Sequence, residues 1–484
     1  MLVTGDKRVI LTPQAIRVEK EIVLRDSQQV ITVVACAKKT RYEAAKGEIK
    51  VGLKVTYKVI YKSENGIEAQ SFSDTSEGVL RNSFIQPASS GTIYTRVTAC
   101  DFSGTQNIKI FTNIELSGYV TAPYSFTFCE PCSGIYAKTA PAEIEKLVAI
   151  KEAEIIASEE YDLKDAQSRD LSVESRAIVT GVNVGGEVVT VNGVVYTHII
   201  YLSGDNLTSR TFSSNFKSEI LAQGISENDF VSIIADCDAT NLTKLNEDGT
   251  KIRIETVISL SGCGIVKEQV YPVVDAYSCD NELTVVEQEA ETDSHLCVAS
   301  GAERIGGSVR IDESKPRIRS VVCVSGVYPE GEEATNFDEL LVEGKVGANV
   351  IYLDENDAYS QVKAQIPYKI SVARNFPCKN DITANTVVSG LTARAKRNDE
   401  IEITGEVFSE VYASGAKTIK YIGEIKEKEP VKRNPAALTI TFAKAGETLW
   451  DIAKKLKVGE DELLSRNKTL ELPLKGGEKI VYYR

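Results

Sequence analysis

One segment of this sequence occurs three times, and it constrains the fold more than any other feature. Residues 51–61, 191–201 and 342–352 align without gaps, and each segment ends in the dipeptide Ile-Tyr. Their last residues lie 140 and then 151 positions apart (61 to 201, and 201 to 352). Self-similarity at this spacing indicates tandem copies of one domain.

The repeated segment predicts a β-strand. In the first copy every second residue is apolar, which is the period of a strand with one buried face. Residues that favour tight turns follow each copy, as at Asn65-Gly66. Other alternating segments open the copies at 30–36, 172–179 and 318–324, and close them at 107–116, 251–260 and 400–408. The fold class that we predict is therefore mainly β, with three antiparallel domains. In each domain one face of the sheet is packed and the other is exposed to water.

Length and composition support several folded domains. A chain of 484 residues is too long for one core and suggests about three to five domains. The content of 42% hydrophobic and 26% charged residues is ordinary for globular proteins. We divide the chain into β domains at 1–135, 136–280 and 281–425, a charged linker with two prolines at 426–437, and a small domain at 438–484.

Two further segments are expected to connect the β domains. Residues 142–156 are charged and only loosely periodic, so this connector could be partly β, and 279–293 are polar. The composition of 426–437 favours an extended tether before the last domain.

The C-terminal domain has a strand–helix–helix–strand pattern. A strand at 438–442 and a turn at 444–447 precede a helix that Thr448 can cap. Asp451 occupies the third helical position, where an acidic side chain suits the free N–H groups. Apolar residues form one face of this helix: Leu449, Ile452, Ala453 and Leu456. A second helix at about 460–466 and a closing strand at 479–483 complete the domain.

This domain resembles the LysM domain, through residues 445–455 (Ala-Gly-Glu-Thr-Leu-Trp-Asp-Ile-Ala-Lys-Lys) and the later matches Val458, Leu463, Asn467, Leu474, Gly476 and Ile480. Two departures are Gly459, where the family usually has a Ser or Thr cap, and Tyr482-Tyr483 in place of a proline after the last strand.

The resemblance implies binding of N-acetylglucosamine polymers in a shallow groove, and the same surface could equally bind a protein. One rim of the groove would be formed by Gly446, Glu447, Thr448 and Leu449, and the other by Asn467, Leu470 and Leu472. Trp450 lies about 100° off the apolar face of the helix, so we expect it to be an exposed anchor, since aromatic residues are favoured at binding hot spots. The alternative interpretation is that Trp450 only covers the flank of the helix.

The three β copies resemble SPOCS domains, the spore-coat-associated modules of endospore-forming bacteria. The strand ending in Ile-Tyr, residues 271–278 (Tyr-Pro-Val-Val-Asp-Ala-Tyr-Ser) and residues 313–316 carry this resemblance. Three tandem copies before one LysM domain are similar to the SipL-like spore morphogenesis family. The resemblance implies a scaffold in the mother-cell cytoplasm at the forespore surface, where its LysM domain docks on the coat-basement ATPase and supports coat and cortex assembly.

Two other functions stay open. The LysM end could anchor the β domains to peptidoglycan, or the protein could be a wall hydrolase with an unrecognised catalytic β domain. Binding to nucleic acid is disfavoured by the net charge of −13 and the pI near 5.1. The start of the chain lacks the pattern of a secretory signal, and no stretch approaches the roughly 20 apolar residues of a membrane span. We therefore expect the protein in the cytoplasm.

The sequence offers little material for catalysis, a metal or a cofactor, and we expect none of them. His198 and His295 are the two histidines, and neither has the spacing of a metal or catalytic site. We expect His198 at the surface. The single CxxC motif, Cys129 and Cys132, is weak evidence for zinc or redox chemistry without a second pair.

Other cysteines and acidic pairs have plainer interpretations. Most of the ten cysteines should be free, buried thiols, and Cys100 and Cys237 should be packing residues. The acidic pairs at 159–160 and 332–333 should lie on solvated faces. No phosphate loop, dinucleotide fingerprint or metalloprotease motif occurs.

Overall fold

Strands dominate the protein. The structure, a computed structural model, describes residues 1–483 except 88, 131, 164–166, 168, 337–338, 375–381 and 433–437. Both helices that it describes lie near the C-terminus, which confirms a mainly β fold with a small helical part at the C-terminal end.

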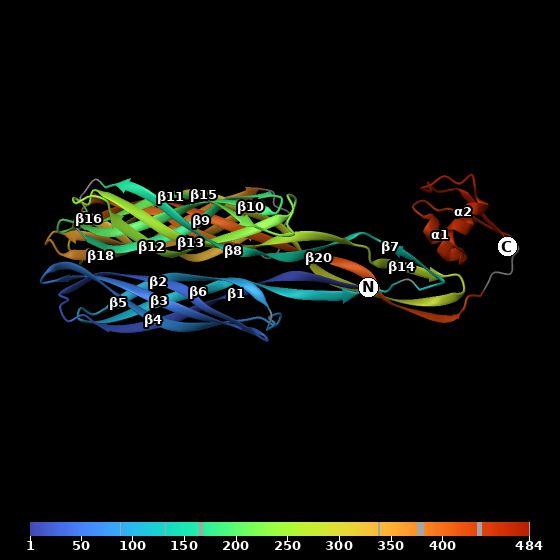
Figure 1. Ribbon diagram of the computed structural model, residues 1–484, viewed down its shortest axis with the longest axis horizontal. Coiled ribbons are helices and arrows are strands. Elements are labelled where there is room, and N and C mark those ends of the chain that lie inside the picture. Colours follow the sequence, from blue (N-terminus) through green and yellow to red (C-terminus); the bar gives the residue numbers. More distant parts are fainter. Residues whose placement is uncertain are drawn as a thin grey trace.

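Three β modules make up most of the molecule (Figure 1). In module 1, one three-stranded antiparallel sheet has the order β1-β6-β5 and a second has the order β2-β3-β4. Side chains of both sheets meet in one core, for example Val51 and Val55 of β3 with Ile108 and Ile114 of β6. The strands are β1 (Leu2–Val23), β2 (Gln29–Ala45), β3 (Glu48–Ser63), β4 (Gly66–Arg81), β5 (Ser90–Ser103) and β6 (Asn107–Thr127).

Modules 2 and 3 repeat this topology, with sheets β8-β13-β12 and β9-β10-β11, and sheets β15-β20-β19 and β16-β17-β18. The repeated sequence segment forms the central strand of one sheet in each module. Module 2 contains β8 (Ala142–Asp162), β9 (Arg169–Gly185), β10 (Val188–Ser203), β11 (Asn206–Leu221), β12 (Phe230–Lys244) and β13 (Lys251–Val270). Module 3 contains β15 (Asn281–Arg310), β16 (Ile318–Asn336), β17 (Glu339–Asp354), β18 (Tyr359–Arg374), β19 (Ile382–Arg397) and β20 (Glu400–Pro430).

Long strands occupy the segments that were predicted to be connectors, including 142–156, for which a partly β structure was expected. Residues 142–156 belong to β8, and 281–293 belong to β15. The first five residues of the predicted linker, 426–430, continue β20 and pair with β15. Lys426 faces Thr284, for example, and Pro430 faces Asn281. The charges in these strands suit ribbon surfaces that stay in contact with water.

The three modules pack around a common axis through equivalent residues. Ile60, Ile200 and Ile351, which precede the repeated tyrosines, are buried in a single cluster. Their neighbours on the chain point the other way, since Val59 and Tyr61 lie in the core of module 1. Two more equivalent triples join the cluster: Ile31, Leu171 and Val322, and then Ile67, Leu207 and Tyr359. The repeated strand is therefore buried on both faces where it ends in Ile-Tyr.

Beyond the module cores, the longest strands continue as three two-stranded ribbons, which we call the stalk. Its ribbons are formed by β1 with β6, β8 with β13, and β15 with β20. They share one apolar cluster that includes Val3, Ile144, Val270, Ile419 and Tyr421. At the end of the stalk, β7 (Ile135–Thr139) pairs with β14 (Val273–Ser278). We call residues 1–432 the array.

The C-terminal domain lies at this end of the array, next to β7 and β14 (Figure 1). Its elements are β21 (Leu438–Phe442), α1 (Leu449–Leu456), α2 (Glu460–Arg466) and β22 (Lys479–Tyr483). β21 pairs antiparallel with β22. The helices cover one side of this small sheet around a core of Leu449, Ile452, Ala453, Leu463 and Ile480.

Candidate binding site on the C-terminal domain

The first rim of the predicted groove is held rigidly by hydrogen bonds. The Asp451 backbone N–H donates to Thr448 Oγ1 (3.3 Å), and the Thr448 N–H donates back to Asp451 Oδ2 (2.8 Å). The hydrogen bonds from Thr448 lower the pKa of Asp451 below its ordinary value. In the preceding turn, Glu447 accepts from the Lys444 N–H (2.9 Å) and Gly446 has a φ of +83°. Such a turn favours glycine, because other residues rarely adopt this φ.

The second rim contains one structural residue and one exposed residue. The Asn467 side-chain amide donates to the carbonyls of Leu463 (2.8 Å) and Val481 (2.7 Å) and accepts from the Val481 N–H (2.8 Å). Asn467 therefore ties α2 to β22. Leu470 packs partly against the domain core, whereas Leu472 is 52% exposed.

The predicted groove residues thus fall into three groups by exposure. Gly446, Thr448 and Leu472 are exposed and available to a ligand. Glu447, Asn467 and Leu470 are half-buried. Leu449 and Trp450 are buried, and Leu449 belongs to the domain core.

Trp450 is not an exposed anchor, so that prediction is wrong. Its side chain is 7% exposed and meets the ring of Tyr277 on β14 edge-on, with centroids 4.9 Å apart. Its indole Nε1 donates to Asp275 Oδ2 (2.8 Å). Trp450 belongs to the apolar cluster of its own domain, and Tyr277 of the array extends this cluster over it.

Further contacts join the C-terminal domain to the array. The Tyr277 hydroxyl donates to the Val458 carbonyl (2.8 Å), and Lys457 Nζ pairs with Glu282 (2.9 Å). Sequence reasoning missed Asp275, Tyr277 and Glu282 as partners of this domain. In the sequence, residues 271–278 indicate only the resemblance of the repeats. No periodicity predicts a contact between residues more than 170 positions apart.

His198 is half-buried between two modules, so its predicted surface location is wrong. Its Nδ1 lies 3.0 Å from Thr211 Oγ1, and its Nε2 lies 3.0 Å from the Val324 carbonyl oxygen of β16. Burial lowers its pKa below the ordinary value. Module 3 covers a strand face that would be solvated in an isolated module 2. The side chain of His295 lies outside the part of the chain that the structure describes.

Fewer of the described cysteines are buried than we expected. Burial raises the pKa of the Cys100 thiol, and Cys323 is also buried, but Cys36 and Cys132 are exposed. Cys129 Sγ and Cys132 Sγ lie 3.4 and 3.9 Å from the carbonyl oxygen of Glu130. Among the described residues, no group of three or more His, Cys, Asp or Glu side chains could hold a metal ion.

We expected residues 332–333 to lie on a solvated face, and this prediction is wrong for Glu332. Its side chain is buried and pairs with Arg96 of module 1, which also binds Glu115 (2.7 Å). Glu159 and Glu160 are exposed as expected, and Glu160 pairs with Arg253 (2.5 Å).

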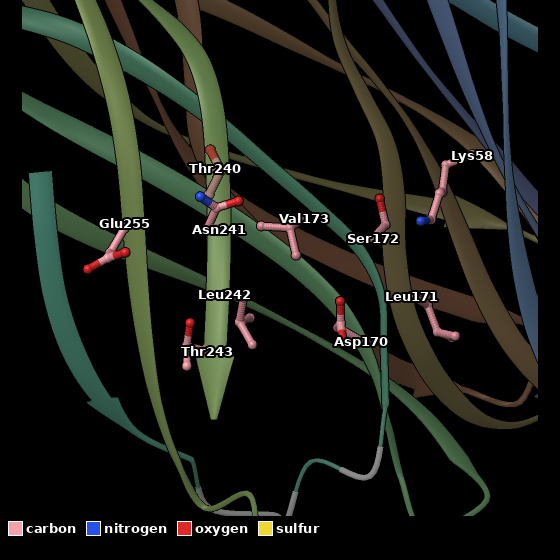
Figure 2. Close-up of a pocket in the computed structure, with 10 residues that line it drawn as sticks. All are labelled: Lys58, Asp170, Leu171, Ser172, Val173, Thr240, Asn241, Leu242, Thr243 and Glu255. Atoms are coloured by element: carbon pink, nitrogen blue, oxygen red, sulfur yellow. The ribbon is translucent and has the colours of Figure 1, made fainter. Parts of the chain in front are cut away.

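An open polar groove of about 590 Å³ lies where module 1 approaches module 2. Figure 2 shows Lys58 of module 1 on one side, the residues 170–173 of β9 in the middle, and 240–243 of β12 beyond them. Asp170 and Glu255 lie on either side of the β12 strand and do not point toward one another. The groove therefore lacks the facing carboxylates that a glycosidase uses.

Comparison with known families identifies the C-terminal domain. Residues 443–473 match the LysM domain family. LysM domains bind N-acetylglucosamine polymers such as peptidoglycan, or proteins, so this end of the chain is a binding domain. No curated protein matches the sequence. None of the described helices is long and apolar enough to cross a membrane.

Proposed function

We propose that this protein is a non-enzymatic scaffold for spore coat and cortex assembly, whose LysM domain docks on a protein partner. The observation that carries the proposal is the position of the LysM domain. It is packed against one end of an elongated three-module array, with Gly446, Thr448 and Leu472 left exposed.

The use of polar groups in the array supports a structural role. The Arg96–Glu332 ion pair joins module 1 to module 3, and His198 joins module 2 to module 3. Lys38 Nζ of module 1 binds the carbonyls of Cys237 (2.7 Å) and Asp238 (2.6 Å) of module 2. Side chains that could serve catalysis in another protein hold the modules together here.

An exposed apolar surface on the LysM domain supports a protein partner. On β21, Leu438, Ile440 and Phe442 project on the side away from the helices and are exposed. Contiguous apolar residues favour contact with another protein, because a sugar polymer needs polar partners for its hydroxyl and amide groups.

The sporulation role rests on the resemblance of the three repeats and the LysM domain to the SipL-like family. On that basis the partner is the coat-basement ATPase. The protein then works in the mother cell at the forespore surface, and the acidic array keeps the docked partner at a set distance from other coat components.

A second candidate function is binding of peptidoglycan or related N-acetylglucosamine polymers. The match of residues 443–473 to the LysM family favours it, as do the exposed rim residues Gly446 and Thr448. In that case the LysM domain anchors the array to the wall.

Binding by the full-length protein separates the two functions. The chain should retain the purified ATPase and fail to bind N-acetylglucosamine hexamer. Leu472→Asp should weaken retention of the ATPase at least tenfold, whereas Leu221→Asp, a control at an exposed leucine of module 2, should leave it unchanged. Binding of the sugar without the ATPase would overturn the scaffold proposal in favour of the wall-binding one.

The location of a fluorescent fusion tests the cellular role. The proposal predicts a ring around the forespore during sporulation. Fluorescence at vegetative septa or in the culture medium would contradict it.

A further inference from the structure

The β7–β14 pair has no place in the architecture of the modules. Its two strands come from the segments that follow modules 1 and 2, and they pair with Tyr136 opposite Tyr277. Each module already has both of its three-stranded sheets without them. The pair packs on the β15–β20 ribbon, where Val273 and Ala276 meet Ile422, and its contacts with the LysM domain indicate a second task.

The polar part of this contact centres on one carboxylate. Asp275 accepts hydrogen bonds from Trp450 Nε1 (2.8 Å) and Lys454 Nζ (2.6 Å), and from the N–H of Ala276 (2.8 Å). Trp450 and Lys454 lie four residues apart on α1, so they project from the same face of the helix. The Asp275 side chain of β14 thus binds two residues of α1 that lie about one helical turn apart.

The apolar part is a stack of three aromatic rings. Tyr136 stacks on Tyr277 with centroids 5.1 Å apart, and Tyr277 meets Trp450 edge-on at 4.9 Å. Tyr277 is 1% exposed and belongs to the same apolar cluster as Leu449 and Ile452 of the LysM domain. Its hydroxyl also binds the Val458 carbonyl at the end of α1.

Gly459 permits a close approach of Tyr136 to the LysM domain. A Cβ atom at this position would lie 2.7 Å from the Tyr136 hydroxyl oxygen, so Tyr136 would have to move. Because Gly459 is the N-cap residue of α2, this helix has no side-chain cap. The glycine leaves α2 without a side-chain cap and permits the close approach of Tyr136.

We propose that the β7–β14 pair is a receptor for helix α1 of the LysM domain. It holds the domain in one orientation at the end of the stalk and keeps the Trp450 face out of ligand binding. A ligand then reaches the domain only through surfaces turned away from β14. This inference is independent of the proposed function, because it holds whether the ligand is a protein or a sugar polymer.

The sole tryptophan of the chain reports the contact directly. In the full-length protein, Tyr277→Ala and Asp275→Ala should each shift Trp450 emission to longer wavelength and raise its quenching by acrylamide at least twofold. The control Tyr271→Ala replaces a tyrosine of the same segment that is 55% exposed, and it should change neither signal. Wild-type-like emission and quenching in both Asp275 and Tyr277 variants would overturn the proposal.

A charge reversal separates docking from a general loss of structure. Glu282→Lys should increase quenching, because it repels Lys457, and adding Lys457→Glu should restore the wild-type value. Hydrogen exchange then shows whether the domain itself survives in the Tyr277→Ala protein. Retained protection of the Ile452 and Leu463 amides shows that the domain folds without its contact to Tyr277, which supports docking of a separately folded domain, and loss of that protection would overturn it.

Discussion

At the scale of single residues, two carboxyl groups show how the surroundings set their ionisation in opposite directions. Burial raises the pKa of Glu410 on β20 to about 7. Burial also acts to raise the pKa of Asp275, but hydrogen bonds from Lys454 and Trp450 outweigh it, so this pKa lies below the ordinary value. Glu410 therefore favours a neutral form in the folded protein, and Asp275 favours a charged one.

Glu410 predicts a loss of stability with rising pH. The unfolded carboxyl ionises near pH 4.5, whereas the folded one stays neutral to about pH 7, so the free energy of unfolding falls between these values. Glu410→Gln should remove most of this fall, which is on the order of 1–3 kcal/mol. Urea denaturation at pH 4.5 and pH 8 measures it. An unchanged pH dependence in the variant would show that Glu410 does not cause the fall.

Asp275 predicts the opposite dependence for docking of the LysM domain. Its stabilising effect is complete above the ordinary aspartate pKa of 3.8 and is lost as the pH falls through the lower folded value. Acrylamide quenching of Trp450 should therefore rise below about pH 4. In the Asp275→Asn variant, acrylamide should quench Trp450 more strongly than in the wild type at pH 7, and the quenching should not rise further in acid.

At the scale of elements, the strands carry compensating pairs of residues across the modules. Gly193 of β10 lies opposite Phe216 of β11, and a Cβ at Gly193 would lie 2.1 Å from the Phe216 ring. Gly344 and Tyr368 form the same combination in module 3. Module 1 has the reverse, with Leu53 opposite Ser76. Each pair fills the same place in its core with one large side chain.

This compensation predicts strong coupling between the two positions. Gly344→Leu alone should cost about 1–3 kcal/mol, because the leucine and Tyr368 compete for one space. Adding Tyr368→Ser recreates the pair of module 1 and should recover most of that loss. A double-mutant cycle from chemical denaturation measures the coupling, and additive effects would contradict the shared space.

The elements themselves were predictable to different degrees. Alternation from Val51 to Tyr61 predicted β3 because one face of this strand is buried in its own module. The cap at Thr448 predicted α1, since capping is a local interaction. By contrast, the charged start of β8 lacked a clear pattern, because a solvated ribbon needs little alternation. The contacts of Trp450 with Tyr277 and of His198 with Val324 could not be predicted, because these partners are distant in sequence and belong to other parts of the molecule.

At the scale of the whole molecule, the three modules are joined by a shared apolar cluster rather than by linkers. Ile60, Ile200 and Ile351 occupy equivalent positions in it, and each is buried among residues of the other modules. The sequence repeat predicted three similar domains, but the second buried face of each repeated strand is visible only in the assembled array.

The shared cluster predicts cooperative unfolding of the array. Ile200→Ala should cost about 2–5 kcal/mol and lower the agreement between calorimetric and van't Hoff enthalpies, because it uncouples the modules. Ile156→Ala, an exposed control in the same module, should have little effect. Three separate transitions in the wild-type protein would contradict this packing.

The central claim is that the array carries its LysM domain as a fixed binding head, and the decay of Trp450 fluorescence anisotropy tests it most directly. Because Trp450 is packed against Tyr277 of the array, the decay should follow the slow tumbling of the whole 52.8-kDa particle. A dominant fast component, with the correlation time of a free domain the size of residues 438–484, would show instead that the LysM domain moves independently of the array.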